Sequence, residues 1–145
     1  EAEKANIQDI ASTFHVSNIT IAAVDVKGEG KEKSTSSAKR ADVLRINFTI
    51  DENRIAPSGT KELYVVVTAP DGKVITNPLG GSGTFTTREE GERSYTTIAS
   101  VQYTQGSSLP VTVDWKQETR FQSGNYKIEI YHNGFKIGEA IKKLK

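Results

Sequence analysis

The regular alternation of apolar and polar residues is the feature that most constrains how this chain folds. It is clearest over residues 43–50, where every second residue is apolar. The apolar positions in this segment are Leu44, Ile46, Phe48 and Ile50. Because successive side chains of a β-strand point to opposite faces, one face of this segment is predicted to join a core and the other to face water.

Similar segments recur along the chain, separated by turn signals. Residues 70–73 (PDGK) favour a tight turn, because Pro fixes φ and Gly tolerates positive φ. Residues 132–134 contain the Asn-Gly pair typical of a two-residue β-hairpin. We expect seven to nine strands, among residues 18–26, 43–50, 61–69, 73–76, 84–87, 95–103, 109–115, 126–130 and 135–144. With no helical pattern after residue 14, this predicts an all-β, two-sheet antiparallel sandwich.

Three segments interrupt the simple alternation. Residues 18–26 change phase midway, which indicates a bulge or a change of partner sheet. Residues 28–40 are almost entirely polar and are predicted to form a long connection, while residues 77–83 (NPLGGSG) are expected to form a glycine-rich loop.

The N-terminal residues follow a different period. Ile7, Ile10 and Phe14 recur at spacings of three and four, which predicts a short helix. A helix this short is marginal alone in water, so it either docks on the domain or ends a longer coiled coil that could make the protein a homo-oligomer. We therefore divide the chain into residues 1–15, the helix, and residues 16–145, the sandwich domain.

Charge and composition exclude several function classes. The 145 residues carry a net charge of +1, so no overall field would attract nucleic acid. No stretch approaches the roughly 20 apolar residues of a membrane-spanning helix, so we expect no direct membrane insertion of this chain. With no cysteine and two histidines, the chain offers no disulfide, no thiolate nucleophile and no three-histidine metal centre, so no cofactor is predicted.

Residues 124–128 (GNYKI) resemble the tyrosine corner of immunoglobulin-like sandwiches, in which the Tyr126 hydroxyl would bond to an upstream carbonyl. Ile128 stands where antibody domains have a cysteine, so the chain resembles the cysteine-free Ig-like or fibronectin-III-like branch. The segments FTIDENRIAPSGTKELYVVVTAPDGKVI and GNYKIEIYHNGFKIGEAIKKL are also similar to C-terminal β-sandwich domains of coiled-coil cell-envelope proteins of Bacteroidetes. This resemblance implies an extracytoplasmic location, in the periplasm or cell envelope, and carries no catalytic residue.

The residues that could support catalysis lack the partners that catalysis needs. General-base work by His15 or His132 would require an orienting carboxylate and a nucleophile, and neither histidine has such a motif beside it. The paired acids at residues 51–52 and 89–90 lie in predicted turns and are expected to be solvated. We therefore predict that the chain is not an enzyme.

Aromatic residues give the candidate ligand or partner surface, formed by Tyr64, Tyr131 and Trp115. Trp115 is in phase with the apolar residues of its strand and is expected to face inward. Tyr64 and Tyr131 are out of phase and are expected at the surface. The predicted function is a non-catalytic structural or protein-interaction module that displays loops such as residues 28–40 to a protein partner. The alternative is a carbohydrate-binding module that stacks these rings on sugars.

Overall fold

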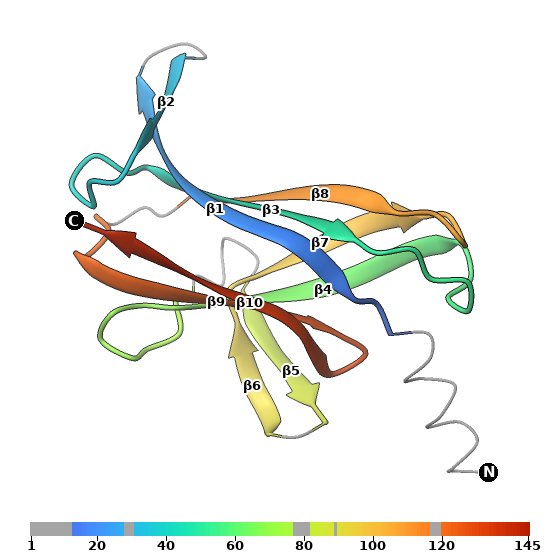
Figure 1. Cartoon of the computed structure of the whole chain (residues 1–145). Coiled ribbons are helices and arrows are strands. Elements are labelled where there is room, and N and C mark those ends of the chain that lie inside the picture. Colours follow the sequence, from blue (N-terminus) through green and yellow to red (C-terminus); the bar gives the residue numbers. More distant parts are fainter. Residues whose placement is uncertain (1–12, 28–30, 77–81, 89, 117–119) are drawn as a thin grey trace.

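The protein is an all-β sandwich of two antiparallel sheets (Figure 1). The computed structural model describes residues 13–27, 31–76, 82–88, 90–116 and 120–145. Residues 1–12 of the expected N-terminal helix lie outside these described residues. Among the described residues no helix is present, and therefore none that could cross a membrane.

Ten strands are assigned in the described residues, against the seven to nine expected. Their bounds are β1 Val16–Lys27, β2 Lys31–Thr35, β3 Val43–Ile50, β4 Gly59–Thr68, β5 Gly83–Thr87, β6 Gly91–Tyr95, β7 Thr97–Tyr103, β8 Leu109–Lys116, β9 Gly124–His132 and β10 Phe135–Leu144. Sheet A has the order β2-β1-β3-β8, sheet B has the order β10-β9-β4-β7, and β5 and β6 form a separate two-stranded hairpin.

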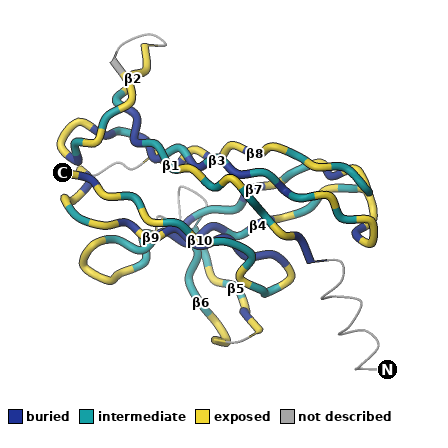
Figure 2. Tube along the Cα trace, in the orientation of Figure 1, coloured by how far each residue is buried: buried dark blue, intermediate teal, exposed yellow. Residues whose placement is uncertain are grey.

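The core lies between the inner faces of sheets A and B, as the alternation predicts. Leu44 pairs with Trp115 and Ile46 with Val113 across β3 and β8, and all four side chains are buried. Leu63, Val65 and Val67 of β4 face them from sheet B. Figure 2 shows the buried segments concentrated along the facing strands, with exposed residues gathered at the loops and hairpin tips.

The prediction that residues 28–40 form only a polar connection is wrong for Lys31–Thr35. This segment is strand β2, which pairs with the second half of β1 from Ala23 onward. The resulting hairpin projects beyond the sandwich (Figure 1), so neither face of β2 needs apolar residues. Strand β1 stays in sheet A along its whole length, so the expected change of partner sheet is wrong. A register shift does occur in β1, between Ser17 and Thr20, where Asn18 has a φ of 55°, but it lies earlier in the strand than the change of phase.

Two other strand predictions are corrected in the region around Thr96, which contacts both segments. The expected strand over residues 73–76 is reduced to an isolated bridge between Thr68 and Val74. The expected strand over residues 95–103 is divided at Thr96, so that β6 joins the hairpin and β7 joins sheet B. Thr96 is buried, and its hydroxyl accepts a hydrogen bond from Val67 N and donates one to Ile75 O. These bonds satisfy the backbone at the point where the chain changes sheets.

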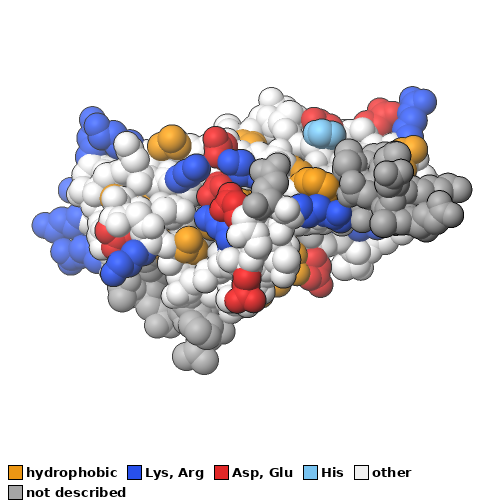
Figure 3. All heavy atoms as spheres, turned by 90° about the horizontal axis from the view of Figure 1, so that it is seen from below, with side chains coloured by type: hydrophobic (Ala, Val, Ile, Leu, Met, Phe, Trp, Pro, Cys, Tyr) orange, Lys and Arg blue, Asp and Glu red, His pale blue; other side chains and the backbone are white. Residues whose placement is uncertain are grey.

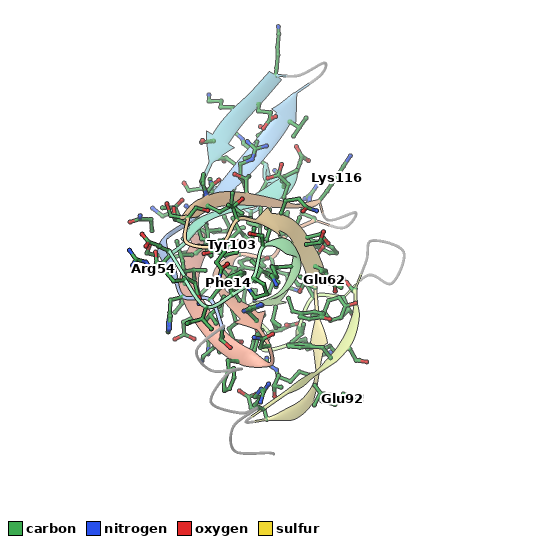
Figure 4. All side chains as sticks on the ribbon, turned by 90° about the vertical axis from the view of Figure 1, so that its right-hand side faces the viewer. Phe14, Arg54, Glu62, Glu92, Tyr103 and Lys116 are labelled. Atoms are coloured by element: carbon green, nitrogen blue, oxygen red, sulfur yellow. The ribbon has the colours of Figure 1, made fainter. Side chains whose placement is uncertain are left out.

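Phe14, expected on the apolar face of a helix, instead fills one end of the core. It is fully buried, lies outside any helix, and its ring centroid is 4.6 Å from that of Tyr103. Figure 4 shows Phe14 and Tyr103 near the middle of the end-on view, whereas Glu92 and Lys116 lie toward its periphery. The described fold therefore includes residues before β1.

The predicted turns and the tyrosine contact are confirmed. Asn133 and Gly134 have φ of 54° and 81°, as the hairpin between β9 and β10 requires, and Gly72 has a φ of 86°. The hydroxyl of Tyr126 donates a hydrogen bond of 2.7 Å to the carbonyl of Gln122.

Candidate functional site

The structure brings Tyr64 and Tyr131 together on the outer face of sheet B. They are paired residues on β4 and β9, and the β5–β6 hairpin folds over them. The centroid of the Phe85 ring lies 4.8 Å from that of Tyr64, with the rings stacked, and 5.1 Å from that of Tyr131. We call these residues the outer cluster, which comprises Tyr64, Val66, Phe85, Tyr95 and Tyr131.

Two positions that strand alternation assigned to the surface are buried. Tyr131 is only 2% exposed and Val66 is fully buried, so the expectation of a surface Tyr131 is wrong. Tyr64 is half-buried. Alternation distinguishes the two faces of a strand but cannot show that a second layer covers the outer face.

A charged pair lies beside the outer cluster, formed by the partly exposed Arg93 and the buried Glu129. Arg93 of β6 donates a hydrogen bond of 2.7 Å to the Tyr131 hydroxyl, and its Nη1 lies 3.4 Å from the carboxylate of Glu129. Tyr131 in turn donates to Glu129 Oε2 at 3.2 Å. The side chain of Glu129 is 5% exposed, and the ammonium of Lys136 lies 3.7 Å away. This arrangement ties the hairpin to sheet B.

The local environment keeps Arg93 charged and Tyr131 protonated. Burial disfavours the charged guanidinium of Arg93, but hydrogen bonding and attraction to Glu129 outweigh it, so the pKa of Arg93 is raised. Burial and the charge of Glu129 raise the pKa of Tyr131. The sequence analysis did not identify either ionic partner, because Arg93 and Glu129 are 36 residues apart and alternation carries no signal of their pairing.

Trp115 is separate from the two tyrosines. It is 4% exposed and faces the core from sheet A, which confirms its predicted orientation. Its Nε1 has no hydrogen-bond partner among the described residues. Sheet B lies between Trp115 and the outer cluster, so the three aromatic residues do not share one surface.

The two histidines occupy different environments. His132 is buried, stacks on Phe14 with ring centroids 4.3 Å apart, and accepts a hydrogen bond of 3.0 Å from Phe14 N at Nδ1. Burial, with a contribution from nearby Lys61, lowers the pKa of His132 to about 4. His15 is exposed. Within the described ranges, no group of three or more His, Asp or Glu side chains is placed to hold a metal ion.

A groove of about 580 Å³ runs along the side of the sandwich where β7 and β8 face each other. Six consecutive residues of each strand line it, residues 97–102 and 109–114. Asp114 is the one ionisable residue of this lining, and its carboxylate already binds Arg45 through two hydrogen bonds of 2.8 and 3.0 Å. We call this feature the edge groove.

The described side chains on the face of the molecule seen from below are mixed in character. In Figure 3 hydrophobic side chains appear on it as separate patches between charged groups of both signs.

One family model matches the chain, over residues 17–145, and is described as "Domain of unknown function (DUF8428)". No curated protein matches the chain.

Solved structures resemble the chain in fold at low sequence identity. A β-glucosidase from Kluyveromyces marxianus in complex with glucose matches 92% of this chain with a TM-score of 0.51 and 13% identity. A GH3 β-glucosidase from Bifidobacterium adolescentis matches 91% with a TM-score of 0.46 and 14% identity. The DNA glycosylase AlkC from Pseudomonas fluorescens matches 99% with a TM-score of 0.47 and 12% identity. The chain spans 14%, 17% and 37% of their respective lengths, and the first likeness concerns the fold alone.

Proposed function

We propose that this chain, which belongs to the DUF8428 family, is a non-catalytic structural or protein-interaction module of an extracytoplasmic envelope protein. The observation that carries this proposal is the edge groove, a concave surface formed by two strands. Its lining contains one ionisable residue, Asp114, which is already paired with Arg45. Such a surface suits contact with polypeptide better than chemistry, because catalysis needs unpaired titratable groups that converge on a substrate.

The placement of the other close charges supports the same proposal. Arg93 and Glu129 hold the hairpin on sheet B, and Arg45 links β3 to Glu32 of β2 and Asp114 of β8. These groups act as structural ties between strands. Their role is therefore to hold one strand against another.

We infer further that the sandwich is of the Ig-like or fibronectin-III-like type. The order β1-β3-β8 corresponds to strands A-B-E of that fold, and β10-β9-β4 corresponds to G-F-C. The bond from Tyr126 to Gln122 occupies the place of the tyrosine corner, at the start of the strand that corresponds to F.

The extracytoplasmic location can be tested with a single thiol, because the chain has no cysteine of its own. We expect Thr84→Cys, at an exposed site on β5, to react in intact cells with a maleimide that cannot cross the inner membrane. A cytoplasmic protein carrying one exposed cysteine is the control. Labelling of Thr84→Cys only after cell lysis would contradict the proposal.

The interaction role can be tested by site-specific photocrosslinking in cells. A benzophenone amino acid is placed at one exposed residue on each of four strands, namely Thr84, Ser100, Thr112 and Lys143. We expect at least one position to give a discrete adduct with another protein. Four positions that yield no more adduct than the same residue in an unrelated β-sandwich would contradict an interaction role.

The alternative, carbohydrate binding, depends on the partly exposed rings of the outer cluster. Tyr64, Phe85 and Tyr95 are half-buried and lie within 6 Å of one another, so part of each ring is accessible. A polysaccharide that binds the chain, and binds Tyr64→Ala at least tenfold more weakly, would support this alternative. A glycan array without binding would remove it.

A further inference from the structure

We infer that the free edge of β7 is a binding site for an extended, uncharged segment of a partner protein, which adds to sheet B as a fifth strand. This inference rests on the proposed interaction function and identifies its surface and ligand chemistry. Strand addition satisfies the unpaired backbone groups of a sheet edge, while alternate side chains of the added strand fill the space beside it.

Sheets A and B have four outermost strands, and three of them carry features that oppose strand addition. Strand β2 contains Lys31, Glu32 and Lys33 in a row. Strand β8 contains Pro110 and ends in Asp114-Trp115-Lys116. Charged side chains and proline on an edge strand are common protections against unwanted pairing.

Strand β10 is protected by charge and by contact with β1. It carries Lys136, Glu139, Lys142 and Lys143. A Cβ added at Gly138 would lie 2.6 Å from Val16 Cγ2 and 2.7 Å from Ile19 Cδ1, so β10 packs closely against β1. This side of the sandwich is therefore closed.

Strand β7 lacks such protection. Its seven residues, TIASVQY, include no charged residue and no proline. One edge of β7 pairs with β4, and no described strand pairs with the other edge. At about 3.4 Å per residue the strand offers roughly 20 Å of backbone for pairing.

The edge groove provides the room that an added strand requires. It lies beside β7, and its floor includes Ala99, Val111 and Val113, which keep 8 to 9% of their surface exposed. Apolar side chains on the inner face of the added strand would cover this floor and extend the core. Side chains on its outer face would lie beside Ser100 and Gln102, which are exposed and polar.

Electrostatics defines the class of segment that fits. The groove offers no unpaired charge to a ligand, since its single carboxylate, on Asp114, is already hydrogen-bonded to Arg45. A charged side chain directed into it would lose hydration without gaining a partner. We therefore expect a segment of about six residues with β-branched or small apolar residues at alternate positions and no charge on its inner face.

The experiment uses a displayed library of random linear heptapeptides, selected on the full chain. We expect the selected peptides to carry uncharged, β-branched residues at alternate positions. On addition of the best synthetic peptide, amide hydrogen exchange should slow at alternate residues of β7 and remain unchanged along β10. Failure to select any peptide, or protection located on another strand, would overturn the inference.

Matched variants test whether binding uses this edge. Ser100→Lys with Gln102→Lys places two charges beside the edge and should weaken peptide binding at least tenfold, whereas Thr84→Lys, an equally exposed change on β5, should not. Ser100→Pro, which introduces proline into the strand, should also weaken binding, provided its circular dichroism spectrum matches that of the wild type. If the double variant Ser100→Lys with Gln102→Lys and the control Thr84→Lys bind the peptide with equal affinity, the inference is overturned.

Two further results separate this inference from its alternatives. If light scattering shows that the chain forms a dimer that Ser100→Lys with Gln102→Lys abolishes, the edge binds a second copy and the peptide assignment is overturned. If a partner protein crosslinks through Thr84 or Lys143 but no peptide binds β7, the proposed interaction function stands and the edge site fails.

Discussion

At the scale of single residues, His132 couples the N-terminal segment to the core through its protonation state. Its Nδ1 accepts the N–H of Phe14, so the imidazole must be unprotonated at that nitrogen for the bond to exist. The ring also stacks on Phe14 and is buried with it. Protonation of His132 would remove the acceptor and place a charge in the core.

This coupling predicts a loss of stability in mildly acidic solution. The pKa of His132 is about 4 in the folded chain and near 6.5 when unfolded, so between these values the unfolded chain binds the extra proton. The free energy of unfolding should therefore fall by roughly 2–3 kcal/mol as pH decreases from 6.5 to 4. Urea denaturation across this range should show the loss in wild type and in His15→Gln, but not in His132→Gln. The same slope in all three proteins would show that His132 is not responsible.

The tyrosine at the start of β9 gives a second prediction at this scale. Tyr126→Phe removes the hydroxyl that donates to Gln122 O and keeps the ring packed against Phe121. We expect the free energy of unfolding to fall by about 1 kcal/mol, the net value of a typical hydrogen bond. Denaturant unfolding measures the change, and a loss above about 3 kcal/mol would indicate that ring packing had also been disturbed.

At the scale of elements, the β5–β6 hairpin forms a second layer over part of sheet B. It contributes Phe85 and Arg93, which contact Tyr131 and Glu129, and Tyr95, whose ring lies against that of Tyr64. Both aromatic contact and the ion pair hold it in place. The position of the hairpin is therefore decided by side chains that are distant in the sequence.

The ion pair between Arg93 and the buried Glu129 predicts a non-additive effect of two substitutions. Arg93→Met leaves the buried carboxylate of Glu129 with the Tyr131 hydroxyl and the more distant Lys136 ammonium as its close partners, and should lower the free energy of unfolding by about 2–4 kcal/mol. Adding Glu129→Gln removes the uncompensated charge, so the double variant should be more stable than Arg93→Met alone. Thermal unfolding of the two variants decides the matter, and a less stable double variant would contradict a buried charge pair.

At the scale of the whole molecule, the two sides of the sandwich differ. Strands β1 and β10 meet closely at Gly138, whereas β7 and β8 leave the edge groove between them. The close approach leaves little room for a Cβ on residue 138. Closure of one side and openness of the other give the sandwich a single preferred side for strand addition.

The closed side predicts that Gly138→Ala is destabilising by about 1–3 kcal/mol, because the new methyl group meets Val16 and Ile19. Ile19→Val deletes the Cδ1 atom, which would lie 2.7 Å from the added methyl carbon, and should recover part of that loss when the two substitutions are combined. Chemical denaturation of the single and double variants provides the measurement. Purely additive losses would indicate that Ile19 does not create the crowding.

The position of Phe14 predicts where the folded part of the chain must begin. A chain that starts at Thr13 keeps Phe14, whereas one that starts at Val16 loses a fully buried aromatic residue. We expect the shorter chain to be less stable by about 3–5 kcal/mol, the usual cost of deleting a core phenylalanine. Equal melting temperatures for the two chains would contradict a core role for Phe14.

The sequence alone determined the all-β class, most strand positions and the inward orientation of Trp115, because these depend on local alternation and turn chemistry. It also identified the hairpin at Asn133-Gly134, and the resemblance of residues 124–128 to a tyrosine corner implied the contact of Tyr126. Only the tertiary structure decided that Tyr131 is buried, that Arg93 meets Glu129, and that Lys31–Thr35 forms a strand. Each of these depends on a partner far away in the chain, and a local pattern carries no information about which segments meet. For the same reason the alternation does not distinguish one edge strand of a sheet from another. In the structure β10, at one end of sheet B, packs closely against β1, whereas no described strand pairs with the outer edge of β7 at the other end.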